Sequence, residues 1–192
     1  MYPIIKAIVK IFCKIFFFVK VVGEENIPKN GAAILAANHT SLWDAPVILT
    51  ATSRPMRTMG KAELFENKIL AYFLRIAGAF PVHRGTGDIT AIKTALKTLK
   101  DGEIFTIFPT GTRVKEGNDA SAKAGVALIA SKSGAPVIPV AIRGGYKPFR
   151  RVTIYIGKPL YIKNENNTKP SGDELKIYAD AILNKLNSLG AE

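Results

Sequence analysis

The stretch "NHTSLWDAP", residues 38–46, places His39 and Asp44 five positions apart after a small, apolar run. A hydroxyl group is too weak an acid to lose its proton at neutral pH, so it is a poor nucleophile by itself. An imidazole can take the proton while the hydroxyl oxygen attacks an electrophilic carbon. A carboxylate on the other ring nitrogen would hold the tautomer and stabilise the imidazolium. The residues therefore predict an acid/base pair, or alternatively a loop histidine beside an aspartate that caps the next helix.

Three further clusters lie at the ends of predicted strands, namely "VHRG" (82–85), "FPTGTR" (108–113) and "VIPVAIRGG" (137–145). In this order and spacing, and together with residues 38–44, they resemble the glycerolipid acyltransferase family. That family contains the bacterial 1-acyl-glycerol-3-phosphate acyltransferases, and its signature His-x-x-x-x-Asp is met by His39 and Asp44. The resemblance implies acyl transfer from a thioester to a lysophospholipid hydroxyl, with His39 as the base and Asp44 as its orienting partner.

The resemblance also implies roles for other residues. Arg84 and Arg113 would bind the acceptor phosphate, because a guanidinium fork matches two phosphate oxygens. Lys61 and the backbone at Gly111 are candidates for stabilising the thioester oxyanion. Thr110 stands where the family pattern Phe-Pro-Glu-Gly-Thr-Arg has glutamate, so the acceptor site lacks a carboxylate. A catalytically weakened or silent lipid-binding relative is therefore an alternative.

Strand-like and helix-like segments alternate after the first 20 residues. The patterns predict strands over 31–38, 54–60, 79–84, 103–109, 135–144 and 151–160, and helices over 44–52, 62–78, 88–102, 121–134 and 171–190. This alternation in 192 residues predicts a single α/β domain with a mixed, largely parallel sheet covered by helices on both faces. Ligands in such sheets bind outside the strand ends.

The N-terminal segment, residues 1–20, is strongly apolar but is interrupted by Lys6, Lys10 and Lys14. These lysines fall on one stripe of a helix and leave a wide apolar arc, and the uninterrupted apolar run is too short to span a bilayer. The pattern predicts a membrane-interface helix over 1–20 followed by an acyltransferase domain over 21–192. The alternative is a helix that packs this arc onto the protein's own core.

The net charge is +12, and no acidic residue occurs between Ala120 and Asn164. An anionic partner is therefore expected, either a bilayer surface, a lysophospholipid, or a thioester of acyl carrier protein or coenzyme A. Nucleic acid is the alternative, but the aromatic residues are not interleaved with basic ones. No metal or redox cofactor is implied. The single cysteine favours a reducing compartment, and the expected location is the cytoplasmic face of the membrane, in a peripheral or monotopic arrangement.

Overall fold

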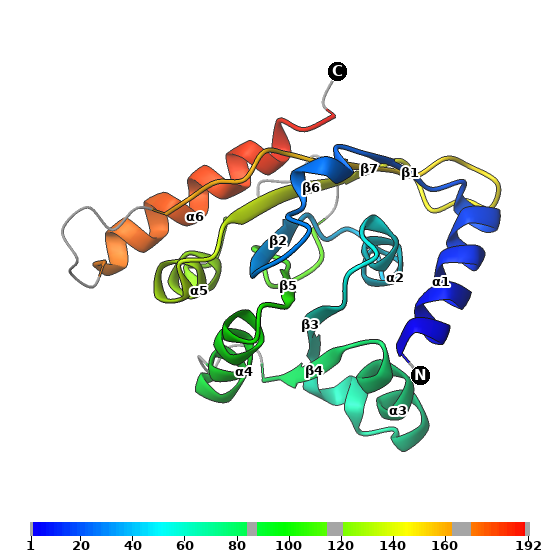
Figure 1. Ribbon diagram of the computed structural model, residues 1–192, viewed down its shortest axis with the longest axis horizontal. Coiled ribbons are helices and arrows are strands. Elements are labelled where there is room, and N and C mark those ends of the chain that lie inside the picture. The colour runs from blue at the N-terminus through cyan, green and yellow to red at the C-terminus, as the bar shows by residue number, and fades with distance from the viewer. Residues whose placement is uncertain (1, 84–87, 115–120, 163–169, 191–192) are drawn as a thin grey trace.

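The structure, a computed structural model, describes residues 2–83, 88–114, 121–162 and 170–190 (Figure 1). Its strands are β1 Lys20–Val22, β2 Ala33–Ala37, β3 Met56–Lys61, β4 Ala79–Val82, β5 Ile104–Ile107, β6 Val137–Arg143 and β7 Thr153–Ile156. Its α-helices are α1 Tyr2–Phe17, α2 Asp44–Ile48, α3 Lys68–Ile76, α4 Ile89–Lys100, α5 Gly125–Ser133 and α6 Gly172–Asn187.

The strands form one sheet in the order β1-β7-β6-β2-β5-β3-β4. The pairs are parallel except for β6 with β7, which run antiparallel from Val140 opposite Ile156 to Arg143 opposite Thr153. The prediction of a mixed, largely parallel sheet is confirmed. Strand β1 was not predicted: helix α1 ends at Phe17, and Lys20 already pairs with Thr153.

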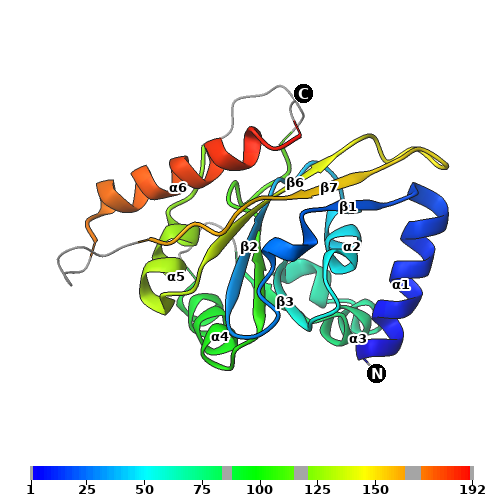
Figure 2. The same ribbon diagram turned by 45° about the horizontal axis from the view of Figure 1, so that its top comes forward.

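Helices cover both faces of the sheet, as predicted (Figures 1 and 2). Strand β2 is buried throughout, and its successive side chains point to opposite faces. Leu35 packs in the cluster that contains residues of α1 and α2, whereas Ile34 packs in the cluster that contains residues of α4, α5 and α6. Because both faces are covered, the carboxyl ends of β2, β3 and β5 are left as the edge where polar loops can gather.

Helix α1 packs one side onto the domain through Cys13 and Phe17 and exposes the other. The predicted lysine stripe is wrong at Lys6, which is buried and donates a hydrogen bond from Nζ to the Arg54 carbonyl over 2.6 Å. Four residues exceed one helical turn, so the stripe drifts and its first member reaches the inner side. Burial lowers the pKa of Lys6 to about 8. No helix among the described residues is both long and apolar enough to cross a membrane.

The predicted helix over 62–78 is wrong in its first part, which forms a short 3-10 turn at Ala62–Phe65. Asn67 then caps α3, because its side-chain oxygen accepts the backbone N–H groups of Ile69 and Leu70 at 3.0 Å each. An asparagine in the middle of a long apolar segment therefore starts a new helix. Gly78, just beyond the end of α3, has a φ of 89°, which suits a glycine after a helix.

Candidate active site

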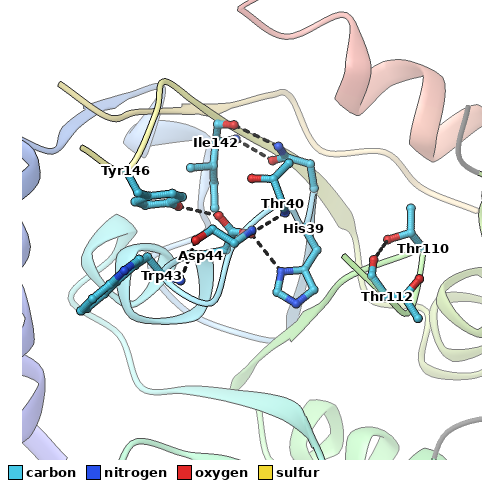
Figure 3. A network of polar contacts seen from close by, with 10 residues as sticks. His39, Thr40, Trp43, Asp44, Thr110, Thr112, Ile142 and Tyr146 are labelled. Carbon is cyan, nitrogen blue, oxygen red and sulfur yellow. Dashed lines mark hydrogen bonds and ion pairs between the residues drawn. The ribbon is translucent and has the colours of Figure 1, made fainter. Parts of the chain in front are cut away.

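His39 and Asp44 are in contact, with Nδ1 of His39 2.9 Å from Oδ2 of Asp44 (Figure 3). The same carboxylate oxygen accepts the backbone N–H groups of Thr40 over 2.6 Å and Ser41 over 2.7 Å. The N-cap position of α2 belongs to Trp43, so the prediction of Asp44 as the helix cap is wrong. The fully buried carboxylate instead fixes the turn before the helix and holds the histidine within that turn.

The hydrogen bonds around His39 decide which ring nitrogen can act as a base. An ionised carboxylate only accepts hydrogen bonds, so Nδ1 carries the proton and Nε2 keeps its lone pair. The His39 side chain is 10% exposed, and its ring stacks on Phe108 with centroids 4.1 Å apart. The backbone N–H of Val114 donates to the His39 carbonyl over 2.8 Å. Residues 108–114 therefore lie directly against His39.

Tyr146, in the connection between β6 and β7, was missed by the sequence interpretation. Its hydroxyl donates to Oδ1 of Asp44 over 2.5 Å. Burial and the Asp44 carboxylate raise the pKa of Tyr146, so the phenol stays protonated and remains a donor. The two residues are 102 positions apart, and only the fold brings them together. The one sequence signal is that Tyr146 directly follows the fourth cluster.

Asn38 is a second residue that the sequence interpretation left without a role. Its side-chain oxygen accepts the N–H of Ile142 over 2.7 Å, and its side-chain nitrogen donates to the Ile142 carbonyl over 2.9 Å. The asparagine thus continues the pairing of β2 with β6 by one residue. It fixes the backbone immediately before His39.

The other predicted site residues are placed as follows. Lys61 ends β3, and its Nζ lies 2.9 Å from the carboxylate of Glu63. The Thr110 hydroxyl donates to the Thr112 carbonyl over 2.8 Å (Figure 3). Gly111 has a φ of 69°, and its N–H donates to the Phe108 carbonyl over 2.9 Å, so this amide is engaged within the turn. Arg113 is exposed.

Arg84 lies outside the described residues. The structure thus brings His39 and Asp44 together and sets the loop that contains Thr110 and Gly111 beside them. The assigned functions of these residues, of Lys61 and of Arg113 stay predictions.

A cavity of about 370 Å³ lies between the sheet and helices α4 and α5. Its apolar walls include Met59, Val82, Ile92, Ile107, Phe108 and Ile129. Phe108 also stacks on His39, so the cavity adjoins the His39 ring. Lys123 lines the cavity and lies over Gly111: a Cβ at Gly111 would be 3.0 Å from Cε of Lys123. Within the described ranges, no group of three or more His, Cys, Asp or Glu side chains is arranged to hold a metal ion.

Comparison with known proteins identifies the family. Residues 18–143 match the protein family described as Acyltransferase. The chain belongs to the acyltransferase family. The matched segment contains His39, Asp44 and the 108–114 loop. The family resemblance noted from the sequence is therefore confirmed, and the protein is an acyltransferase enzyme.

Two curated relatives of this acyltransferase carry the name 1-acyl-sn-glycerol-3-phosphate acyltransferase. The protein of Bacillus subtilis is 35% identical over 178 residues, which are 89% of this chain and 87% of the relative. The protein of Streptococcus pneumoniae is 34% identical over 167 residues, 83% of this chain and 61% of the relative. A solved structure, the 1-acyl-sn-glycerophosphate acyltransferase PlsC from Thermotoga maritima, matches with a TM-score of 0.72 and 29% identity over 100% of this chain and 81% of that one.

Proposed function

We propose that this acyltransferase moves a fatty acyl group from an acyl thioester to the free hydroxyl of lysophosphatidic acid, forming phosphatidic acid for phospholipid synthesis. The observation that carries the proposal is the buried contact between His39 and Asp44, which leaves Nε2 of the histidine as a base. The names of the relatives support lysophosphatidic acid as the acceptor.

In the proposed reaction, Nε2 of His39 takes the proton of the acceptor hydroxyl while the hydroxyl oxygen attacks the thioester carbonyl carbon. Asp44 stabilises the imidazolium through Nδ1. Collapse of the tetrahedral intermediate breaks the carbon–sulfur bond, and the leaving thiolate receives the proton from Nε2. The products are an ester and a free thiol, and the histidine returns to its starting state.

The cavity beside Phe108 supports an acyl substrate. Its volume of about 370 Å³ lies within the range of small-molecule sites, and its walls are largely apolar. The proposed donor is a thioester of acyl carrier protein or of coenzyme A. The proton transfers described above need neither a metal nor a redox cofactor.

We also propose that the enzyme works peripherally at a membrane surface, on the cytoplasmic side. Support comes from α1, whose outer side exposes large apolar residues, namely Ile4, Ile8, Ile11 and Ile15. The same helix also exposes two lysines, Lys10 and Lys14. Such a helix can place its apolar side at the acyl boundary and its lysines among anionic headgroups.

The test is to incubate the purified protein with lysophosphatidic acid and either acyl carrier protein or coenzyme A thioesters, and to follow thiol release. We expect release that depends on the acceptor, and its loss in both His39→Ala and His39→Gln. The glutamine variant keeps a polar side chain of similar length but has no base. Thermal unfolding measures whether each variant is folded. Acceptor binding without thiol release in the wild type would instead indicate a silent lipid-binding relative.

A further inference from the structure

Helix α3 turns an apolar side toward solvent. Ile69 is 73% exposed and Phe73 is 53% exposed, and Leu70 and Tyr72, which lie on the same side of the helix, are also exposed. Ala71 faces inward and is buried. A surface helix of a globular protein normally shows the opposite arrangement, with polar residues outward. Clusters of large exposed apolar side chains are typical of interaction surfaces.

The C-terminal end of α3 lies close to the start of α1. The Tyr2 hydroxyl, at the start of α1, accepts the N–H of Met56 over 3.0 Å. The Tyr2 ring also lies next to Gly78, two residues beyond the end of α3, since a Cβ at Gly78 would be 3.6 Å from the ring. Figures 1 and 2 both place the two helices on the side of the molecule away from α6. The two helices therefore lie on the same side of the molecule.

The charges around these helices suit an anionic partner. Neither α1 nor α3 contains an aspartate or a glutamate, and Lys10, Lys14 and Lys68 are exposed. The acidic residues nearest to α3 in sequence, Glu63 and Glu66, both precede its cap, and Glu63 pairs with Lys61 at 2.9 Å. Apolar side chains flanked by lysines match the acyl boundary and the headgroups of an anionic bilayer.

We propose that the exposed side of α3, through Ile69, Leu70, Tyr72 and Phe73, is a second bilayer contact that acts together with α1. The proposal rests on the proposed function in two respects: the acceptor is a bilayer lipid, and α1 contacts the bilayer. A single interfacial helix leaves a domain free to rotate about it, whereas two contacts fix one orientation.

The orientation fixed by the two contacts brings the active-site edge to the lipid. Helix α1 ends at Phe17, whose ring lies 5.2 Å from that of Trp43. Leu42 and Trp43 are exposed and stand in the turn between His39 and Asp44. Helix α3 begins seven positions after Lys61, the last residue of β3. A bilayer in contact with both helices would therefore meet the turn that contains the base.

The test measures binding of the full chain to vesicles of phosphatidylglycerol and phosphatidylcholine in equal parts, by flotation and without any substrate. The double variant Ile69→Ser with Phe73→Ser should bind at least about tenfold more weakly, because two large side chains no longer enter the acyl boundary. The matched control is Ile177→Ser with Tyr161→Ser, whose side chains are 66% and 67% exposed away from α3. It should bind as the wild type does. Thermal unfolding checks that both variants are folded.

Several outcomes would overturn the α3 proposal. Equal binding by the α3 variant and the wild type would remove α3 from the contact, and an equal loss in the matched control would mean that no specific surface is used. A dimer that the α3 variant breaks would assign this side to a second copy of the chain. A loss confined to binding of acyl carrier protein would assign it to the donor. Because no turnover is measured, these results stand apart from the thiol-release test of the proposed function.

Discussion

Two loops meet at His39, and they are held in different ways. In residues 39–44, the buried carboxylate of Asp44 accepts hydrogen bonds from His39, two backbone N–H groups and Tyr146. In residues 108–114, the Thr110 hydroxyl bonds a carbonyl two positions away, and Thr112 and Arg113 are exposed. The first loop is therefore bonded to Tyr146, 102 positions along the chain, whereas the Thr110 side chain in the second loop bonds only within its own loop.

The difference corresponds to the two proposed tasks. A general base must be fixed in position and tautomer before the substrate arrives, because reorganisation during the reaction would cost rate. The 108–114 loop, which we propose to meet the acceptor phosphate, exposes Thr112 and Arg113, so a change in it should cost less. Substitutions in the first loop should therefore affect the chemical step strongly, and those in the second should affect acceptor binding mildly.

The largest effect after loss of the base is expected for Asp44→Asn. The amide carries no negative charge to stabilise the imidazolium, and its NH2 group can impose the wrong tautomer on His39. We expect kcat to fall by about three orders of magnitude or more, as judged from the equivalent change in hydrolase triads. Steady-state thiol release measures it.

The control for Asp44→Asn is Asp101→Asn, which removes an exposed carboxylate paired with Lys97 at 2.6 Å and should leave kcat unchanged. A fall in kcat of less than tenfold, with the fold intact, would show that the carboxylate does not assist the base.

Tyr146→Phe should have an intermediate effect, because it removes one hydrogen bond to the charged Asp44 and keeps the ring that packs on Phe17. Without this bond the Asp44 carboxylate is less firmly positioned, and so is the imidazole that it orients, so kcat should fall about tenfold. The acidic limb of the kcat/KM profile should also move to higher pH. The Asp44 carboxylate loses a hydrogen-bond donor in this variant, so the pair of His39 and Asp44 should hold its proton more tightly.

This pH shift separates positioning from simple damage, since a loosened fold lowers activity without moving the limb in that direction. Cys13 also lies near Tyr146, but burial raises the pKa of its thiol to about 11, so it stays neutral over this range. Tyr161→Phe, at an exposed tyrosine, is the control. An unmoved acidic limb in Tyr146→Phe would exclude Tyr146 from the positioning of the dyad.

The contact between His39 and Asp44 could be predicted from the sequence because both residues belong to one strand–turn–helix unit. Tyr146 could not, because its place depends on the antiparallel return of β7 against β6, and a hydroxyl on an irregular connection leaves no periodic pattern. The largely parallel sheet followed from the alternation of apolar strands and helices. Strand β1 could not be predicted, because its three residues are too few to show the alternation of apolar and polar side chains that indicates a strand.

Helix α1 shows a second limit of the sequence pattern. Its apolar arc was recognised, but both sides of the helix are largely apolar, so the buried side could not be distinguished. The inward place of Lys6 is set by the Arg54 carbonyl, which lies 48 positions along the chain. A long-range partner of this kind decides which side of the helix is buried.

Thr110→Glu is expected to have the smallest effect and tests the second loop directly. It restores the family carboxylate beside Gly111, over which the Lys123 side chain lies. If the acceptor site lacks a charged hydrogen-bond partner, the variant should lower KM for lysophosphatidic acid by up to about tenfold with little change in kcat. Thr110→Gln, of similar size but uncharged, should give a smaller gain. An unchanged KM in both variants would mean that other residues already supply the contact that glutamate makes in the family. A changed kcat would instead mean that residue 110 affects the chemical step, as residues 39–44 do.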